Sequence, residues 1–87
     1  MIEVINPATG EKVKTYEEMT PEEVKTAIEN SHKAFQSWRK TDFSHRAGLM
    51  KKAAQVLRDN DQVYAELMAV EMGKPVRDGR AEVEKCA

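Results

Sequence analysis

The sequence has a single cysteine and no excess of charge of either sign, and each shortage excludes a class of protein. Cys86 has no second cysteine to pair with, so the chain has no internal disulfide and no Cys/His cluster for zinc. Lysine and arginine number 14 against 15 acidic residues, which excludes a strongly basic nucleic-acid binder. No long apolar run marks a signal peptide or a transmembrane helix. We therefore expect a cytoplasmic chain that binds neither nucleic acid nor a membrane.

The chain also has few means to hold a core by itself. Hydrophobic residues make up 40% of its 87 positions and charged residues 33%. A chain of this length buries only about 60% of its unfolded surface, and many such chains need disulfides or metals. Neither is expected here, so the sequence indicates one small domain or a piece of one.

The N-terminal residues have the pattern of a β-hairpin, expected over residues 2–16. Residues 2–5 (IEVI) and 13–16 (VKTY) are rich in β-branched side chains and alternate with a period of two. Between them, Pro7 and Gly10 favour a turn. A lone two-stranded hairpin is marginal in water, so this one needs a further layer to pack against.

The strongest local signal marks the start of a helix over about residues 21–40. Thr20 and Glu23 form a capping box in which each side chain can accept from the other's backbone N–H, with Pro21 at the first helical position. The opposite face is charged, and Glu29 and Lys33 are spaced for an ion pair. The residues that recur at three and four along one apolar face are Val24, Ala27, Ile28, Ser31, Ala34, Phe35 and Trp38.

Three further helices are expected over about residues 45–59, 61–72 and 76–87. Ser44 is a suitable N-cap for the first of them. Each helix has apolar residues at helical spacing on one side. The residues expected to face inward are Ala47, Met50, Ala53, Ala54, Leu57, Val63, Leu67, Met68, Ala69, Val70, Val83 and Ala87.

The two later helices are separated by a clear stop signal. Gly73 is expected in the left-handed conformation at the end of one helix, and Pro75 prevents that helix from continuing. The last helix reaches Ala87 without a glycine, a proline or a cap. We therefore expect the domain to be incomplete at that point.

No residue that could carry chemistry has the neighbours it would need. Cys86 lies late in a helix beside glutamates that disfavour its thiolate, so we expect a buried or half-buried structural thiol. His32 and His45 lie on different helices and form no serine–histidine–aspartate pattern. Residues 73–75 (GKP) lack both the upstream glycine and the Ser/Thr of a phosphate loop. We expect no catalytic, cofactor-binding or metal-binding residue in this chain.

The order of short motifs nevertheless resembles the N-terminal segment of the aldehyde dehydrogenase superfamily. Residues 6–11 (NPATGE) are similar to its hairpin turn, and residues 34–38 (AFQSW) to the A-F-x-x-W end of its first helix. Residues 46–49 (RAGL) resemble its R-x-x-x-L region, one residue short of the usual spacing. Residues 71–75 (EMGKP) and 80–83 (RAEV) are similar to its E-x-G-K-P and (R/K)-x-E-V stretches, and together most resemble the succinate-semialdehyde dehydrogenase branch.

The resemblance implies that residues 1–87 are a fragment of an α/β NAD(P)-binding domain, mainly α with an N-terminal β-hairpin. The parent enzyme would oxidise succinate semialdehyde to succinate with NAD or NADP, through a cysteine thiohemiacetal and hydride transfer. The family's glycine-rich cofactor stretch, general-base glutamate and nucleophilic cysteine lie beyond the matched segment, so the fragment itself is expected to be inert.

The resemblance also points to a cation position. In some family members a monovalent cation lies near positions that correspond to the carbonyl of Ile5 and to Glu71. Because further ligands lie outside the matched segment, no bound ion is expected in this chain.

The residues alone leave a second class of protein open, a free-standing helical interaction module without enzymatic activity. The unterminated last helix argues against it. The apolar face that includes Phe35 and Trp38, together with the unpaired strand edges of the hairpin, predicts self-association. We expect a two-fold homo-oligomer with Phe35 or Trp38 near its interface.

Overall fold

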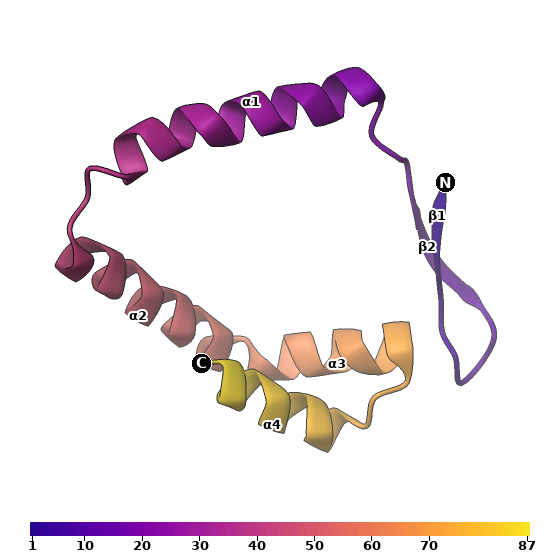
Figure 1. Ribbon diagram of the computed structural model, residues 1–87. Coiled ribbons are helices and arrows are strands. Elements are labelled where there is room, and N and C mark those ends of the chain that lie inside the picture. Colours follow the sequence, from indigo (N-terminus) through magenta and orange to yellow (C-terminus); the bar gives the residue numbers. More distant parts are fainter.

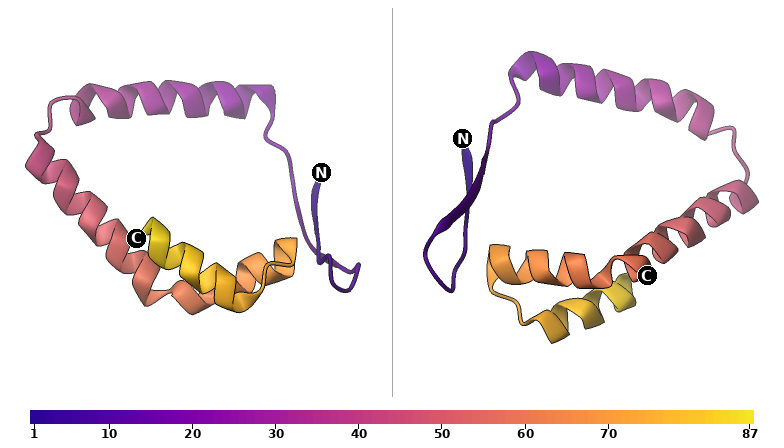
Figure 2. Two further views of the ribbon diagram at one scale, coloured as in Figure 1. Left: turned by 60° about the horizontal axis from the view of Figure 1, so that its bottom comes forward. Right: turned by 180° about the vertical axis from the view of Figure 1, so that it is seen from behind.

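The computed structural model describes all 87 residues and is mainly helical with an N-terminal two-stranded antiparallel hairpin, as the sequence predicts. Its elements follow in the order β1 (Ile2–Ile5), β2 (Lys12–Tyr16), α1 (Pro21–Trp38), α2 (Phe43–Asp59), α3 (Asp61–Met72) and α4 (Val76–Cys86). They surround an open middle. α1 and α2 form two of its sides, α3 and α4 lie together along the third, and the hairpin lies on the fourth (Figures 1 and 2). None of the helices has both the length and the apolar character to span a bilayer.

The start of α1 has the capping box that the sequence predicts. The Thr20 hydroxyl accepts from the backbone N–H of Glu23 at 3.2 Å, and the Glu23 carboxylate accepts from the N–H of Thr20 at 2.8 Å. Further along the helix, the i,i+4 ion pair is Lys25–Glu29 at 3.9 Å, in place of the expected Glu29–Lys33 pair. Both side chains are exposed, so this pair adds little stability.

Thr20→Ala is expected to destabilise α1 by about 1 kcal/mol, because the backbone N–H of Glu23 loses its acceptor. The effect should appear as faster amide exchange in the first turn of α1 and as reduced helical circular dichroism. Thr26→Ala, in the middle of the same helix, is the control and should leave the first turn unchanged. Equal exchange rates in the first turn of both variants would contradict the role of the box.

The helix α2 begins two residues earlier than expected, because Asp42 and not Ser44 is its N-cap. The Asp42 carboxylate accepts from the backbone N–H of His45 at 2.8 Å and from the Ser44 hydroxyl at 3.1 Å. Both bonds hold the pKa of the Asp42 carboxyl below its ordinary value, and the bond from the His45 N–H has the larger effect. The cap is therefore charged at neutral pH, and its contribution is lost as the pH falls through that lowered pKa.

The closest packing in the chain lies between α3 and α4. Ala65 on α3 is fully buried, and on α4 Val83 is 3% exposed and Gly79 is buried against Ala65. A Cβ placed on Gly79 would lie 3.1 Å from both the Cα and the Cβ of Ala65. Any side chain at position 79 would therefore require the backbones of α3 and α4 to move apart by a few tenths of an ångström.

Several residues expected to face inward are exposed. Val63 and Leu67 on α3 are 60% and 52% exposed, and Met50 on α2 is more exposed still. The expectation for Val83 is confirmed, whereas Ala65, which the periodicity did not select, is the most buried residue. The reason is that α4 packs against the Ala65 side of α3, and no element of the chain covers the side that carries Val63 and Leu67.

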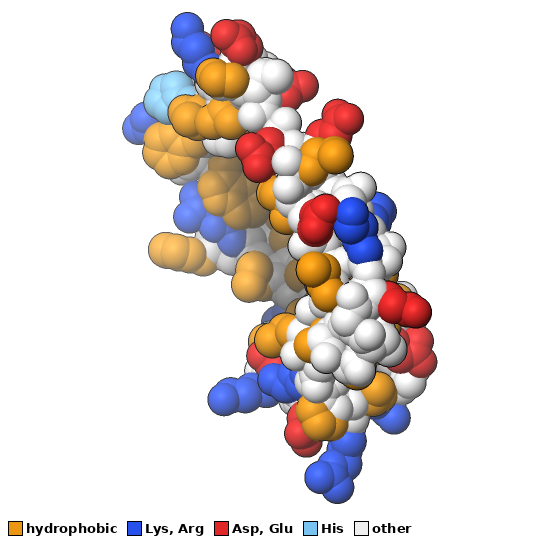
Figure 3. All heavy atoms as spheres, turned by 90° about the vertical axis from the view of Figure 1, so that its right-hand side faces the viewer, with side chains coloured by type: hydrophobic (Ala, Val, Ile, Leu, Met, Phe, Trp, Pro, Cys, Tyr) orange, Lys and Arg blue, Asp and Glu red, His pale blue; other side chains and the backbone are white.

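The chain as a whole is far from spherical. Its radius of gyration is 17.4 Å, whereas a compact domain of this length has one of about 12 Å. Its accessible surface is 7293 Å², against about 5,200 Å² for a folded monomer of this mass. Figure 3 shows hydrophobic side chains gathered along the surface and beside a hollow, without a covering layer. The chain therefore leaves roughly 2,000 Å² more surface in water than a compact monomer would.

The hairpin is joined to the helices through one close contact. Gly73 ends α3 with φ of 74°, the left-handed conformation that the sequence predicts, and Gly10 has φ of 76° in the hairpin turn. A Cβ on Gly73 would lie 3.0 Å from Cγ of Pro7. The end of α3 thus packs directly against the hairpin turn, but the strands have no covering layer, because every residue of β1 and β2 except Val4 is exposed.

Candidate functional site

The corner between α1 and α2 is organised by one arginine. Arg46 donates from Nε to the Thr41 hydroxyl at 2.8 Å and from Nη2 to the carbonyl of Trp38 at 3.0 Å. Its guanidinium also lies over the Trp38 ring, 5.6 Å from the ring centre. Arg46 therefore satisfies a carbonyl at the end of α1 and sets the angle at which α2 leaves it.

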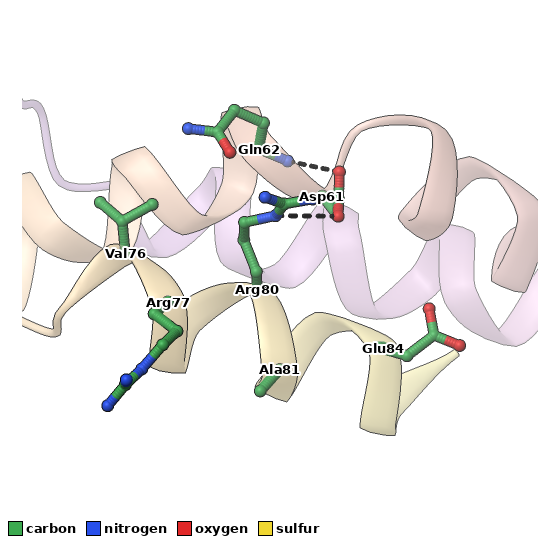
Figure 4. A pocket seen from close by; sticks show the side chains of 7 residues that line it. All are labelled: Asp61, Gln62, Val76, Arg77, Arg80, Ala81 and Glu84. Atoms are coloured by element: carbon green, nitrogen blue, oxygen red, sulfur yellow. Dashed lines mark hydrogen bonds and ion pairs between the residues drawn. The ribbon is translucent and has the colours of Figure 1, made fainter.

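The largest hollow on the surface, about 640 Å³, lies along α4 beside the first turn of α3. Arg80 on α4 donates to the Asp61 carboxylate on α3 at 3.2 Å, while Arg77 points away from the hollow (Figure 4). Glu84, which also lines it, is paired with Arg58 at 3.2 Å. Because these charges pair with one another, they join the helices and do not form a site for an anion.

A second hollow, about 310 Å³, is mainly apolar and lies along α3 and α4; we name it the α3–α4 groove. Leu67, Met68, Met72 and Val83 are among the side chains that line it, together with Glu71 and Glu82. Lys74 pairs with Glu82 across the turn between the two helices, and the hydrogen bond and charge of Lys74 lower the pKa of the Glu82 carboxyl. The groove is therefore an apolar surface with two carboxylates, one of them neutralised.

The residues singled out in the sequence do not gather at one site. Cys86 is exposed on the last turn of α4, so the expectation of a buried or half-buried thiol is wrong. The reason is that Cys86 lines open hollows beside both α3 and α2, and neither helix covers it. His32 hydrogen-bonds with Gln36 on α1 at 3.0 Å, and His45 packs edge-on against Trp38. The two histidines have different partners, and no cluster of three or more potential metal-binding side chains is present.

Residues 73–75 form the end of α3 and the turn into α4, as expected for a helix stop. Glu71, one of the two positions that the resemblance relates to a cation, lies in the α3–α4 groove, and Ile5 lies where the register of the hairpin shifts.

Sequence reasoning missed the contact of Gly79 with Ala65, although a signal for it was present. A glycine inside a helix costs about 1 kcal/mol relative to alanine, so its presence in the middle of an expected helix indicates a close approach of another backbone. The structure supplies that neighbour, since Ala65 is 3.1 Å from the position of a Cβ. A second missed feature is the Arg46 corner, whose acceptors lie outside its own helix.

The chain is a scaffold of four helices and a hairpin. Comparison with known proteins identifies the family to which it belongs. The model of the aldehyde dehydrogenase family matches residues 1–87, and the chain belongs to that family. It is 42% identical over 86 residues to the NADP(+) succinate-semialdehyde dehydrogenase 1 of Mycobacterium tuberculosis. It is 40% identical to a probable NADP(+) succinate-semialdehyde dehydrogenase of Synechocystis and 41% identical to an aldehyde dehydrogenase of Paenarthrobacter nicotinovorans.

These relatives are much longer than the chain. Each comparison covers 99% of this chain and 19% of the relative, so the chain spans about a fifth of the length of the curated relatives it matches. The family resemblance of the motifs, including their similarity to the succinate-semialdehyde dehydrogenase branch, is confirmed.

Proposed function

We propose that these residues form the opening section of the cofactor-binding domain of an aldehyde dehydrogenase that oxidises succinate semialdehyde to succinate with NADP(+). The observation that carries the proposal is the 42% identity over 86 residues to a relative named for that substrate and cofactor. The surface excess of roughly 2,000 Å² over a compact monomer supports it, because such a section would pack against the rest of a larger domain.

In this role the chain supplies structure and no reacting group. The Gly79–Ala65 contact joins α3 to α4, the Arg46 corner joins α1 to α2, and the Pro7–Gly73 contact joins the hairpin to α3. Together these contacts fix the positions of the elements on which the rest of a nucleotide-binding domain would pack. NADP(+), when bound to the whole enzyme, would accept the hydride from the substrate.

The test is a chimera in which this chain replaces the matching residues of the Mycobacterium tuberculosis relative. We expect NADPH formation with succinate semialdehyde at a kcat/KM within about tenfold of the unaltered relative. The isolated chain should form no NADPH. A chimera that folds and binds NADP(+) but does not oxidise succinate semialdehyde would contradict the proposal.

A control variant separates scaffolding from chemistry. The same chimera with Gly79→Leu should lose activity together with thermal stability, because the α3–α4 contact is broken. If activity fell in that variant while stability stayed unchanged, the scaffold role proposed for α3 and α4 would be wrong.

A further inference from the structure

One face of α1 carries apolar side chains that no other element of the chain covers. We name Val24, Ile28, Phe35 and Trp38 the α1 stripe; they are between 44% and 65% exposed. Their spacing places them on one side of the helix. No residue of α1 is buried, and none of the closely packed pairs of elements includes this helix (Figures 1 and 2). The stripe is therefore formed, but not covered, within these residues.

The rest of α1 is suited to water. Thr26 lies on the face opposite the stripe, and Lys25 and Glu29 form an exposed ion pair beside it. A helix that is apolar on one side and polar on the other is typical of a helix that packs against a larger core. Most helices in proteins owe their stability to the packing of such a face. The helix α1 lacks that packing within this chain.

The proposed function supplies an occupant for this face. The match covers 19% of the Mycobacterium tuberculosis relative, so roughly four-fifths of that enzyme lies outside it. In a dehydrogenase of that length the remainder is tethered to the stripe, and tethering raises its effective concentration into the millimolar range. A second copy of the section is far more dilute. The remainder of the same enzyme is therefore favoured over a second copy as the partner of the stripe.

The area available is larger than in an ordinary contact between proteins. The chain leaves roughly 2,000 Å² more surface in water than a compact monomer of its mass. Covering this surplus buries a similar area on the partner, about 4,000 Å² in total, whereas a standard interface buries about 1,600 Å². Areas well above the standard are typical of partners that stay together permanently. A covalent link is therefore not needed to hold the section in place.

We propose that the α1 stripe docks on an apolar surface of the remainder of the dehydrogenase, and that this contact retains residues 1–87 even when the chain is cut after them. The inference rests on the proposed function and deepens it. It names the helix face through which the section binds the remainder, and it states that the contact is strong enough to act without a covalent link.

The first test uses the chimera described above, with the recognition sequence of a specific protease inserted after Ala87. The uncut chimera should keep the thermal stability that it has without the insertion. After cleavage, we expect residues 1–87 to elute with the remainder in gel filtration at micromolar concentration. Release of the section, as a monomer or in the self-association that the sequence predicts, would overturn the proposal.

Substitutions on α1 locate the contact in the cut chimera. Ile28→Asp places a charge in the stripe and should raise the rate at which the section leaves at least about tenfold. Ile28→Ala removes most of the side chain without adding a charge and should act in the same direction, but less strongly. Thr26→Asp is the matched control on the opposite face and should leave the rate unchanged. Equal rates for Ile28→Asp and Thr26→Asp would show that the stripe is not the contact.

Amide exchange tests the same contact in the chimera without the insertion and without cleavage. In the isolated chain α1 has no covered face, whereas Ala65 on α3 is already fully buried. We therefore expect exchange in α1 to be at least about tenfold slower in the chimera than in the isolated chain, and exchange around Ala65 to change much less. Unchanged exchange in α1 would contradict the proposal.

These measurements separate the contact from the proposed activity, because neither elution nor amide exchange depends on the substrate. A chimera that retains the cut section but does not oxidise succinate semialdehyde would refute the proposed function and support the contact. An active chimera that loses the section after cleavage would refute the contact and leave the proposed function standing.

Discussion

Replacing Gly79 with leucine is expected to separate α3 from α4 and to destabilise the chain by about 2 kcal/mol. A side chain at this position meets the backbone of Ala65, which a rotamer change cannot move aside. Overpacking of this kind costs up to about 3 kcal/mol, and the better helix propensity of leucine offsets only about 1 kcal/mol of that cost. The clash therefore outweighs the gain in propensity. The free energy of unfolding in urea, followed by circular dichroism, measures the difference.

The chain offers a matched control in Gly48. This glycine lies in the middle of α2, and a Cβ placed on it meets no atom within 4 Å. Gly48→Leu should therefore show the propensity gain alone and stabilise the chain by about 1 kcal/mol. If both variants shifted stability in the same direction, the close approach of α3 and α4 would not be the cause.

The second large effect is expected at the corner between α1 and α2. Arg46→Ala removes two hydrogen bonds, to the Thr41 hydroxyl and the Trp38 carbonyl, and the contact with the indole ring. Together these contributions amount to about 2 kcal/mol at a half-buried site. Since α1 packs on neither α3 nor α4, little else holds its orientation, and the angle between α1 and α2 should become variable.

Trp38 is the only tryptophan, so its fluorescence reports directly on this corner. In Arg46→Ala we expect a red-shifted emission and faster amide exchange at Thr41, measured at concentrations where the chain is monomeric. Arg39→Ala is the control, because Arg39 lies over the Phe35 ring and has no bond to the corner. Unchanged emission in the Arg46 variant would show that the arginine does not position Trp38.

The features that the sequence predicted correctly are those with a local cause. The capping box at Thr20 needs only a side chain three residues away, and the left-handed Gly73 needs only the stop of its own helix. The hairpin follows from alternation and a turn. The same holds for the family resemblance, because its motifs lie largely at turns and helix ends, where local geometry restricts the residue.

The features that the sequence predicted wrongly depend on residues far away in the chain. Periodicity identifies the apolar face of a helix, but it does not tell whether another element covers that face; exposed Leu67 on α3 and buried Val83 on α4 show both outcomes. The choice between Asp42 and Ser44 as the cap of α2 depends on where the preceding turn ends. Cys86 was expected to be buried or half-buried because it lies in a helix, but the hollows beside α2 and α3 leave it exposed.

The Pro7–Gly73 contact also has a consequence for synthesis on the ribosome. The hairpin turn leaves the ribosome early, whereas its partner at the end of α3 is made much later. At about 5–20 residues per second, the delay between positions 7 and 73 is on the order of 3–13 s. During that interval the hairpin lacks its contact with α3, and the free edges of its strands are open to other nascent chains and to chaperones. Slower translation of the helical region would lengthen this exposure, and faster translation would shorten it.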